Sequence, residues 1–155
     1  MTGERLQVRG GRQHFVYSKV MAWVAMDRAV KSVEDMGLSG PVDRWRRVRD
    51  EIHAEVCAKG YDEARGAFVQ SYGSSALDAA TLLIPQVGFL PADDPRLHAT
   101  VMAIADELTD DGLVLRYRVE ETDDGLEGEE GTFTICSFWL VSALSEIGEH
   151  HLARD

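Results

Sequence analysis

The chain has 155 residues, of which 27 are acidic and 16 basic, and its formal net charge is -11 at pH 7. This length fits one domain over residues 1–155, and 45% hydrophobic with 28% charged residues is typical of a folded globular protein. The acidic balance excludes a nucleic-acid partner, because no basic stripe offsets the repulsion from phosphates. No apolar run approaches the roughly 18 residues of a membrane span, and polar residues follow Met1 directly. We therefore expect a soluble, cytoplasmic protein with no signal peptide and no membrane partner.

The sequence predicts five helices. The first covers residues 16–36 and is nearly all apolar in its first turns, so we expect it to be buried on almost every side. The second covers residues 43–59 and has apolar positions at spacings of three and four, which is typical of an outer, amphipathic helix. The third covers residues 77–87, is apolar on most faces, and has Pro85 where its last turn would kink or close.

The fourth predicted helix begins at Pro95, with Asp93 or Asp94 as its cap, and carries one apolar stripe down to Leu108. The fifth covers residues 133–147, and we expect it to be buried nearly all round. Short extended pieces are predicted at residues 67–72 and 113–119, so the fold class is all-α with small strands in the loops.

Broadly and narrowly apolar helices thus alternate along the chain. Trp23, Leu82 and Trp139 mark the three broadly apolar helices at nearly equal intervals, and both tryptophans have the spacing of packing residues. Such alternation favours helix pairs wound into a toroid, with one helix of each pair inside. All inner helices then run the same way, so the polar loops 7–14, 71–78 and 123–132 should open together on one face, where a polar ligand could bind.

Three stretches of sequence resemble glycoside hydrolase family 15, the glucoamylase and bacterial trehalase family. They are Gln7–Ala29 (QVRGGRQHFVYSKVMAWVAMDRA), Phe68–Ala80 with Gly88–Pro95 (FVQSYGSSALDAA, GFLPADDP), and Gly128–Val141 (GEEGTFTICSFWLV). The resemblance implies part of an (α/α)6 barrel that hydrolyses α-glucosidic bonds, in trehalose, maltose or an α-glucan, with inversion. Inversion requires one protonated carboxylic acid and a second carboxylate that activates water.

The chain departs from that family at both chemical positions. The glutamate that serves as general acid aligns with Gln7, whose carboxamide has no acidic proton to transfer. A shifted register would instead use Glu4. The general base of the family lies beyond the segment equivalent to this C-terminus, so we expect the chain to be inactive alone. Two other interpretations are a non-catalytic helical carbohydrate-binding or assembly module, and a broken reading frame with further helices encoded nearby.

Four other residues match positions around the sugar cleft of the family. Arg9 follows the acid position, where it could bind sugar hydroxyls or form a structural ion pair. Asp78 opens the third predicted helix and could bind glucose hydroxyls or simply favour the helix dipole. Tyr72 could stack on a sugar or pack in its loop, and Glu130 could contact ligand at the third loop. His14 is expected to order the first loop.

The expected partner is an α-glucoside or α-glucan substrate, together with self-association through helices that an open toroid leaves uncovered. No cofactor and no metal are expected. The histidines show no metal-ligand spacing, and Cys57 and Cys136 are placed as reduced packing residues.

Overall fold

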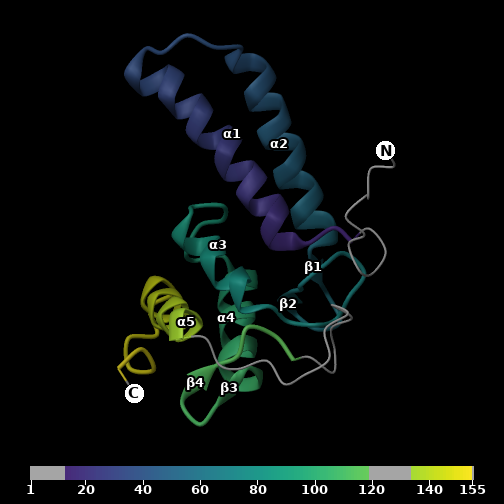
Figure 1. Ribbon diagram of the computed structural model, residues 1–155, viewed down its shortest axis with the longest axis vertical. Coiled ribbons are helices and arrows are strands. Elements are labelled where there is room, and N and C mark those ends of the chain that lie inside the picture. The colour runs from purple at the N-terminus through teal and green to yellow at the C-terminus, as the bar shows by residue number, and fades with distance from the viewer. Residues whose placement is uncertain (1–12, 119–133, 155) are drawn as a thin grey trace, which may run out of the picture.

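The computed structural model describes residues 13–118 and 134–154, and it is built mainly from helices (Figure 1). The elements in chain order are α1 (Val16–Met36), α2 (Val42–Lys59), β1 (Tyr61–Asp62), β2 (Ala67–Phe68), the 3-10 helix η1 (Ala79–Leu82), α3 (Leu83–Gln86), α4 (Pro95–Glu107), β3 (Thr109–Asp110), β4 (Leu113–Val114) and α5 (Thr134–Glu146). The prediction of an all-α fold with short extended pieces is confirmed.

The first two helices form a long hairpin that extends past α3 (Figure 1). α1 begins and ends where the apolar periodicity predicts, and α2 begins one residue earlier than predicted. Gly37 ends α1 with φ 67, and its N–H donates to the Val33 carbonyl at 3.1 Å. A side chain would be strained at that φ, so glycine suits this end of the helix.

The prediction of one α-helix over residues 77–87 is wrong. The chain is extended at Asp78, makes one 3-10 turn in η1, and continues only through the four residues of α3. Pro85 explains the tight turn, because it has no N–H to donate to the residue-81 carbonyl and its ring crowds that carbonyl in an α-helix. Gly88, with φ 72, then turns the chain away.

The fourth helix follows the prediction at its start. Asp94 is the cap, its carboxylate accepts the Arg96 N–H at 2.9 Å, and Pro95 is the first helical residue. After α4, β3 and β4 pair antiparallel around Asp111 and Gly112, whose φ values of 47 and 77 are those of a tight hairpin turn. Of the extended piece predicted at residues 113–119, residues 113 and 114 form a strand, the described residues 115–118 do not, and residue 119 lies outside the described residues.

Two adjoining clusters of buried side chains form the core. One lies between α1, α2, β2, α3 and the start of α4, and the other between η1, α4, β4 and α5. The prediction that α1 and α5 are buried on almost every side is wrong. On α1 the side chain of Met21 is 38% exposed, and on α5 those of Ile135, Phe138 and Val141 are 55%, 66% and 44% exposed. This agrees with the expectation that an open set of helix pairs leaves apolar surface uncovered. None of the helices in the described stretches is long and apolar enough to cross a membrane.

Candidate functional site

The start of α1 is held against the loop that precedes η1. Phe15 and Ser71 form an antiparallel β-bridge, the Val16 N–H donates to the Gln70 carbonyl at 2.9 Å, and the Tyr72 N–H donates to the His14 carbonyl at 3.0 Å. Figure 1 shows the beginning of α1 on the same side of the molecule as β1 and β2. The first two of the predicted loops therefore meet where their helices begin.

Tyr72 lies at this junction. Its ring stacks on His14 with centroids 5.6 Å apart and an interplanar angle of 20°, and the ammonium groups of Lys19 and Lys59 lie 5.9 and 6.0 Å from its centroid. Burial raises the pKa of Tyr72 to about 12, and the negative charge of Glu55 acts in the same direction. The hydroxyl is buried and has no hydrogen-bond partner among the described residues. It is thus a protonated donor at neutral pH. That His14 orders the first loop stays a prediction, because residues 7–12 of that loop lie outside the described residues.

Asp78 joins the second loop to the chain before α5. Its carboxylate accepts the Ala80 N–H at 2.8 Å, which makes it the cap of η1, and one of its oxygens lies 3.5 Å from Nε of Arg116. The Ala79 N–H donates to the Arg116 carbonyl at 2.7 Å. Asp78 therefore has the capping role that its position allowed, and a sugar contact stays a prediction.

The start of α5 is tied to the same region, because the Val114 N–H donates to the Ser137 hydroxyl at 3.0 Å. Hydrogen bonds thus connect the segments at which α1, η1 and α5 begin. We call this set the mouth strip: residues 14–16, 70–72, 78–80, 114–116 and 137.

Two of the five predicted site residues, Tyr72 and Asp78, lie in the mouth strip. Gln7, Arg9 and Glu130 lie outside the described residues. Sequence reasoning missed Arg116, although its place in a predicted extended piece just before the third polar loop was a usable signal. Within residues 13–118 and 134–154, no three His, Cys, Asp or Glu side chains are grouped so that they could hold a metal ion.

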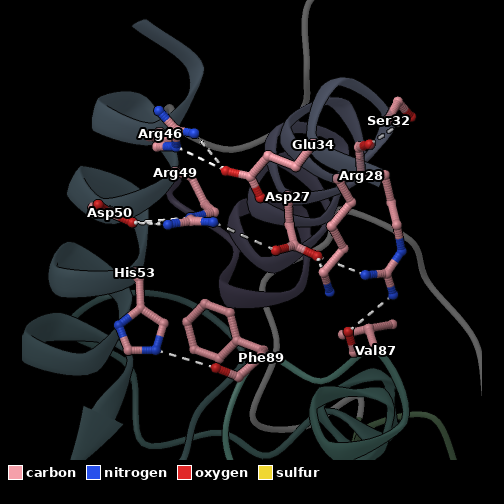
Figure 2. Close-up of polar contacts among 11 residues, drawn as sticks. Asp27, Arg28, Ser32, Glu34, Arg46, Arg49, Asp50, His53, Val87 and Phe89 are labelled. Carbon is pink, nitrogen blue, oxygen red and sulfur yellow. Dashed lines mark hydrogen bonds and ion pairs between the residues drawn. The ribbon is translucent and has the colours of Figure 1, made fainter. Parts of the chain in front are cut away.

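A second polar cluster lies between α1 and α2 (Figure 2). Asp27 is 6% exposed in its side chain, and its carboxylate oxygens lie 2.6 Å from Arg28, 2.9 Å from Lys31 and 3.8 Å from Arg49. Beside it is an open cavity of about 340 Å³, lined by Trp23, Asp27, Arg49, Asp50, His53 and Phe89. We did not predict this cluster, because Asp27 interrupts an otherwise apolar stretch.

Two solved glycosidase structures share this arrangement of helices. A wild-type glycosidase superposes with a TM-score of 0.75 at 25% sequence identity, covering 90% of this chain and 36% of its own. A glycosidase variant in complex with glucose superposes with a TM-score of 0.77 at 24% identity, covering 92% of this chain and 36% of its own. The fold is therefore part of the helical toroid of this class of glycoside hydrolases.

The particular family follows from the sequence profile of glycosyl hydrolases family 15, which matches residues 4–153, so the chain belongs to this family. The trehalases of Mycolicibacterium smegmatis and Mycobacterium tuberculosis are 64% and 63% identical over 148 and 143 residues, covering 96% and 92% of this chain. A trehalase of Thermoplasma volcanium is 46% identical over 144 residues, or 92% of this chain. The chain spans 22%, 21% and 23% of these relatives' lengths.

Proposed function

We propose that the chain contributes one part of a site that hydrolyses trehalose with inversion, and that the 155 residues alone bind sugar without cleaving it. The observation that supports this most is the match of nearly the whole chain to proteins named trehalase, at up to 64% identity. Maltose and α-glucans are the other substrates that the family resemblance allows.

The chemistry explains why binding and cleavage separate. An inverting glycosidase needs a carboxylic acid beside the leaving oxygen and a carboxylate that activates water on the opposite side. Gln7 stands at the acid position, and its carboxamide can hydrogen-bond an oxygen but has no acidic proton to give. In this proposal the base is supplied by a part of the barrel that this chain does not match, since the chain spans 22% of the Mycolicibacterium smegmatis trehalase.

In this proposal the mouth strip forms one wall of the sugar cleft. The Tyr72 hydroxyl is buried and has no partner among the described residues, and we propose that it donates to a sugar oxygen once ligand binding exposes it. Asp78 can accept a sugar hydroxyl while it caps η1, since a carboxylate has about four lone-pair positions. Arg9 and Glu130 are proposed to contact the same ligand from the first and third loops.

The test measures binding and turnover separately. The purified chain is titrated with trehalose, maltose and a soluble α-glucan by calorimetry, and glucose release is measured with the same three sugars. We expect binding of trehalose in preference to the others and no glucose release. Replacing Tyr72 with Phe should weaken that binding several-fold, whereas Tyr17→Phe, at a half-buried tyrosine of α1 outside the mouth strip, should not.

Three outcomes would contradict the proposal in different ways. Glucose release that is lost in Gln7→Ala would show that the chain is a working enzyme in spite of its carboxamide. Equal or stronger binding of the α-glucan would instead favour a general carbohydrate-binding module, and no binding of any sugar would remove the role given to the mouth strip.

A further inference from the structure

The open cavity beside Asp27 lies apart from the mouth strip. Its lining comes from α1, α2 and the turn after α3, and none of its residues belongs to the mouth strip. On α1 the lining residues Trp23 and Asp27 follow Val16 by seven and eleven positions, which is about 10 and 16 Å further along the helix axis. The cavity is therefore a separate place on the fold where a ligand can bind.

Buried aromatic rings form the apolar part of this lining. Trp23 is 7% exposed and Phe89 is 3% exposed, and their rings meet edge to face with centroids 5.1 Å apart. The His53 ring packs on Phe89 at 4.6 Å, and its Nε2 lies 3.1 Å from the Phe89 carbonyl oxygen. Because a carbonyl only accepts, Nε2 carries the hydrogen. These contacts hold the three rings in place before a ligand arrives, which reduces the ordering cost of binding.

The charged side chains of the lining already have counter-ions. Nε and Nη2 of Arg49 both lie 2.9 Å from Oδ1 of Asp50. Oδ2 of Asp27 lies 2.6 Å from Arg28 and 2.9 Å from Lys31, which approach it from outside the cavity lining. The cavity therefore offers no unbalanced charge to offset the desolvation of a ligand ion, and it favours a neutral ligand.

One donor and one acceptor of the lining face each other without a hydrogen bond. Nη1 of Arg49 and Oδ1 of Asp27 lie 3.8 Å apart, which is beyond hydrogen-bond distance (Figure 2). A hydroxyl between them can donate to the carboxylate and accept from the guanidinium. A water molecule can do the same, but it occupies about 30 Å³, whereas the cavity measures about 340 Å³. That volume falls at the low end of the range for small-molecule sites, about 300–1,000 Å³.

We propose that this cavity is a second sugar site, which binds a neutral monosaccharide such as glucose between α1 and α2. One sugar hydroxyl bridges Asp27 and Arg49, and another donates to the Asp50 carboxylate, whose side chain is 65% exposed at the rim. The C–H surface of the sugar ring rests on Trp23 and Phe89. The inference does not depend on the trehalose site proposed for the mouth strip, because the two sites share no residue.

The first test follows the indole N–H signals of the three tryptophans by NMR while the intact chain is titrated with glucose. Trp23 lines the cavity, whereas Trp45 and Trp139 do not, so we expect the Trp23 signal alone to shift and to saturate at millimolar glucose. The mouth strip contains no tryptophan, so a failure here is distinct from a failure of the trehalose site. An unmoved Trp23 signal up to about 100 mM glucose would overturn the proposal, and so would equal shifts of all three signals.

Two glucose analogues test whether the ligand is neutral. At pH 7, 6-amino-6-deoxyglucose carries a positive charge and glucuronate a negative charge, while both keep the sugar ring. We expect both to bind several-fold more weakly than glucose, because the lining has no free counter-ion for either charge. Tighter binding of the cation or of the anion would show that the site takes an ion, and would refute the assignment to a neutral sugar.

A matched pair of variants tests the bridging hydroxyl. Arg49→Met keeps the aliphatic part of the side chain and removes its N–H donors, so the dissociation constant for glucose should rise about tenfold. Arg46→Met is the control, because Arg46 also lies on α2 but pairs with Glu34 and Asp43 and does not line the cavity. Circular dichroism establishes that both variants are folded. Unchanged glucose binding in folded Arg49→Met, or equal weakening in both variants, would contradict the role given to Arg49.

Discussion

The cluster around Asp27 gives the sharpest prediction for stability. Asp27→Asn keeps the shape of the side chain and removes its charge. It leaves Arg28, Lys31 and Arg49 without the carboxylate to which they converge from two helices. Arg28 keeps its other hydrogen bond, to the Val87 carbonyl at 3.2 Å (Figure 2).

The loss of stability expected for Asp27→Asn follows from how deeply the carboxylate and its three cationic partners are buried. Asp27 is 6% exposed, whereas the side chains of Arg28, Lys31 and Arg49 are 50%, 52% and 26% exposed. Breaking a fully buried pair costs about 3–5 kcal/mol, and an exposed pair about 0–1 kcal/mol. Because water screens the cations but not the carboxylate, we expect Asp27→Asn to lower the free energy of unfolding by about 2 kcal/mol.

Urea unfolding followed by tryptophan fluorescence measures this change, and the melting temperature should fall by about 4–8 °C. Asp43→Asn is the control, because Asp43 also lies 2.7 Å from an arginine, Arg46, but is 93% exposed. Its effect should stay below about 0.5 kcal/mol. If the two substitutions cost the same, burial of Asp27 would not be what makes its ion pairs stabilising, and the reasoning would fail.

Two further predictions concern single polar groups. Thr100 is 1% exposed and its hydroxyl accepts the Phe68 N–H at 3.0 Å. Thr100→Val should therefore lower the free energy of unfolding by about 1–3 kcal/mol. Thr109→Val is the control, because Thr109 is exposed, and it should change the free energy of unfolding by less than about 0.5 kcal/mol. Equal effects in urea unfolding would refute this. The raised pKa of Tyr72, about 12, means that the folded state holds this proton more tightly than the unfolded state, so its contribution to stability is present below pH 10 and lost as the pH rises to about 12. The urea midpoint of unfolding should therefore fall less between pH 9 and pH 11 in Tyr72→Phe than in the wild type. An equal fall in the two proteins would contradict the raised pKa of Tyr72.

Local chemistry made much of the fold predictable. The long apolar run that ends at Gly37 predicted α1, and the Asp94-Pro95 pair predicted the start of α4. The third helix was not predicted correctly, because an apolar stretch fits an α-helix and a 3-10 turn equally well, and Pro85 was expected to affect only the last turn. The exposure of Phe138 depends on which other helices are present, and periodicity within one helix carries no information about them.

The candidate site was predictable only in outline. The direction of the inner helices predicted that the polar loops share one face. The hydrogen bonds at Tyr72 and Asp78 place the 71–78 loop beside the start of α1 and residue 116, whereas residues 7–12 and 123–132 of the other two loops lie outside the described residues. The contact between Arg116 and Asp78 joins residues 38 positions apart. No spacing rule connects such a pair, because it arises from the packing of separate helix pairs.

The hairpin of α1 and α2 has a consequence for the order in which the chain folds. Its helices are neighbours in sequence, so closing the loop between them costs little conformational entropy and can happen early. Arg28 on α1 and His53 on α2 then present two donors to the carbonyls of Val87 and Phe89. A hairpin that forms first can therefore fix the turn after α3 through these two hydrogen bonds.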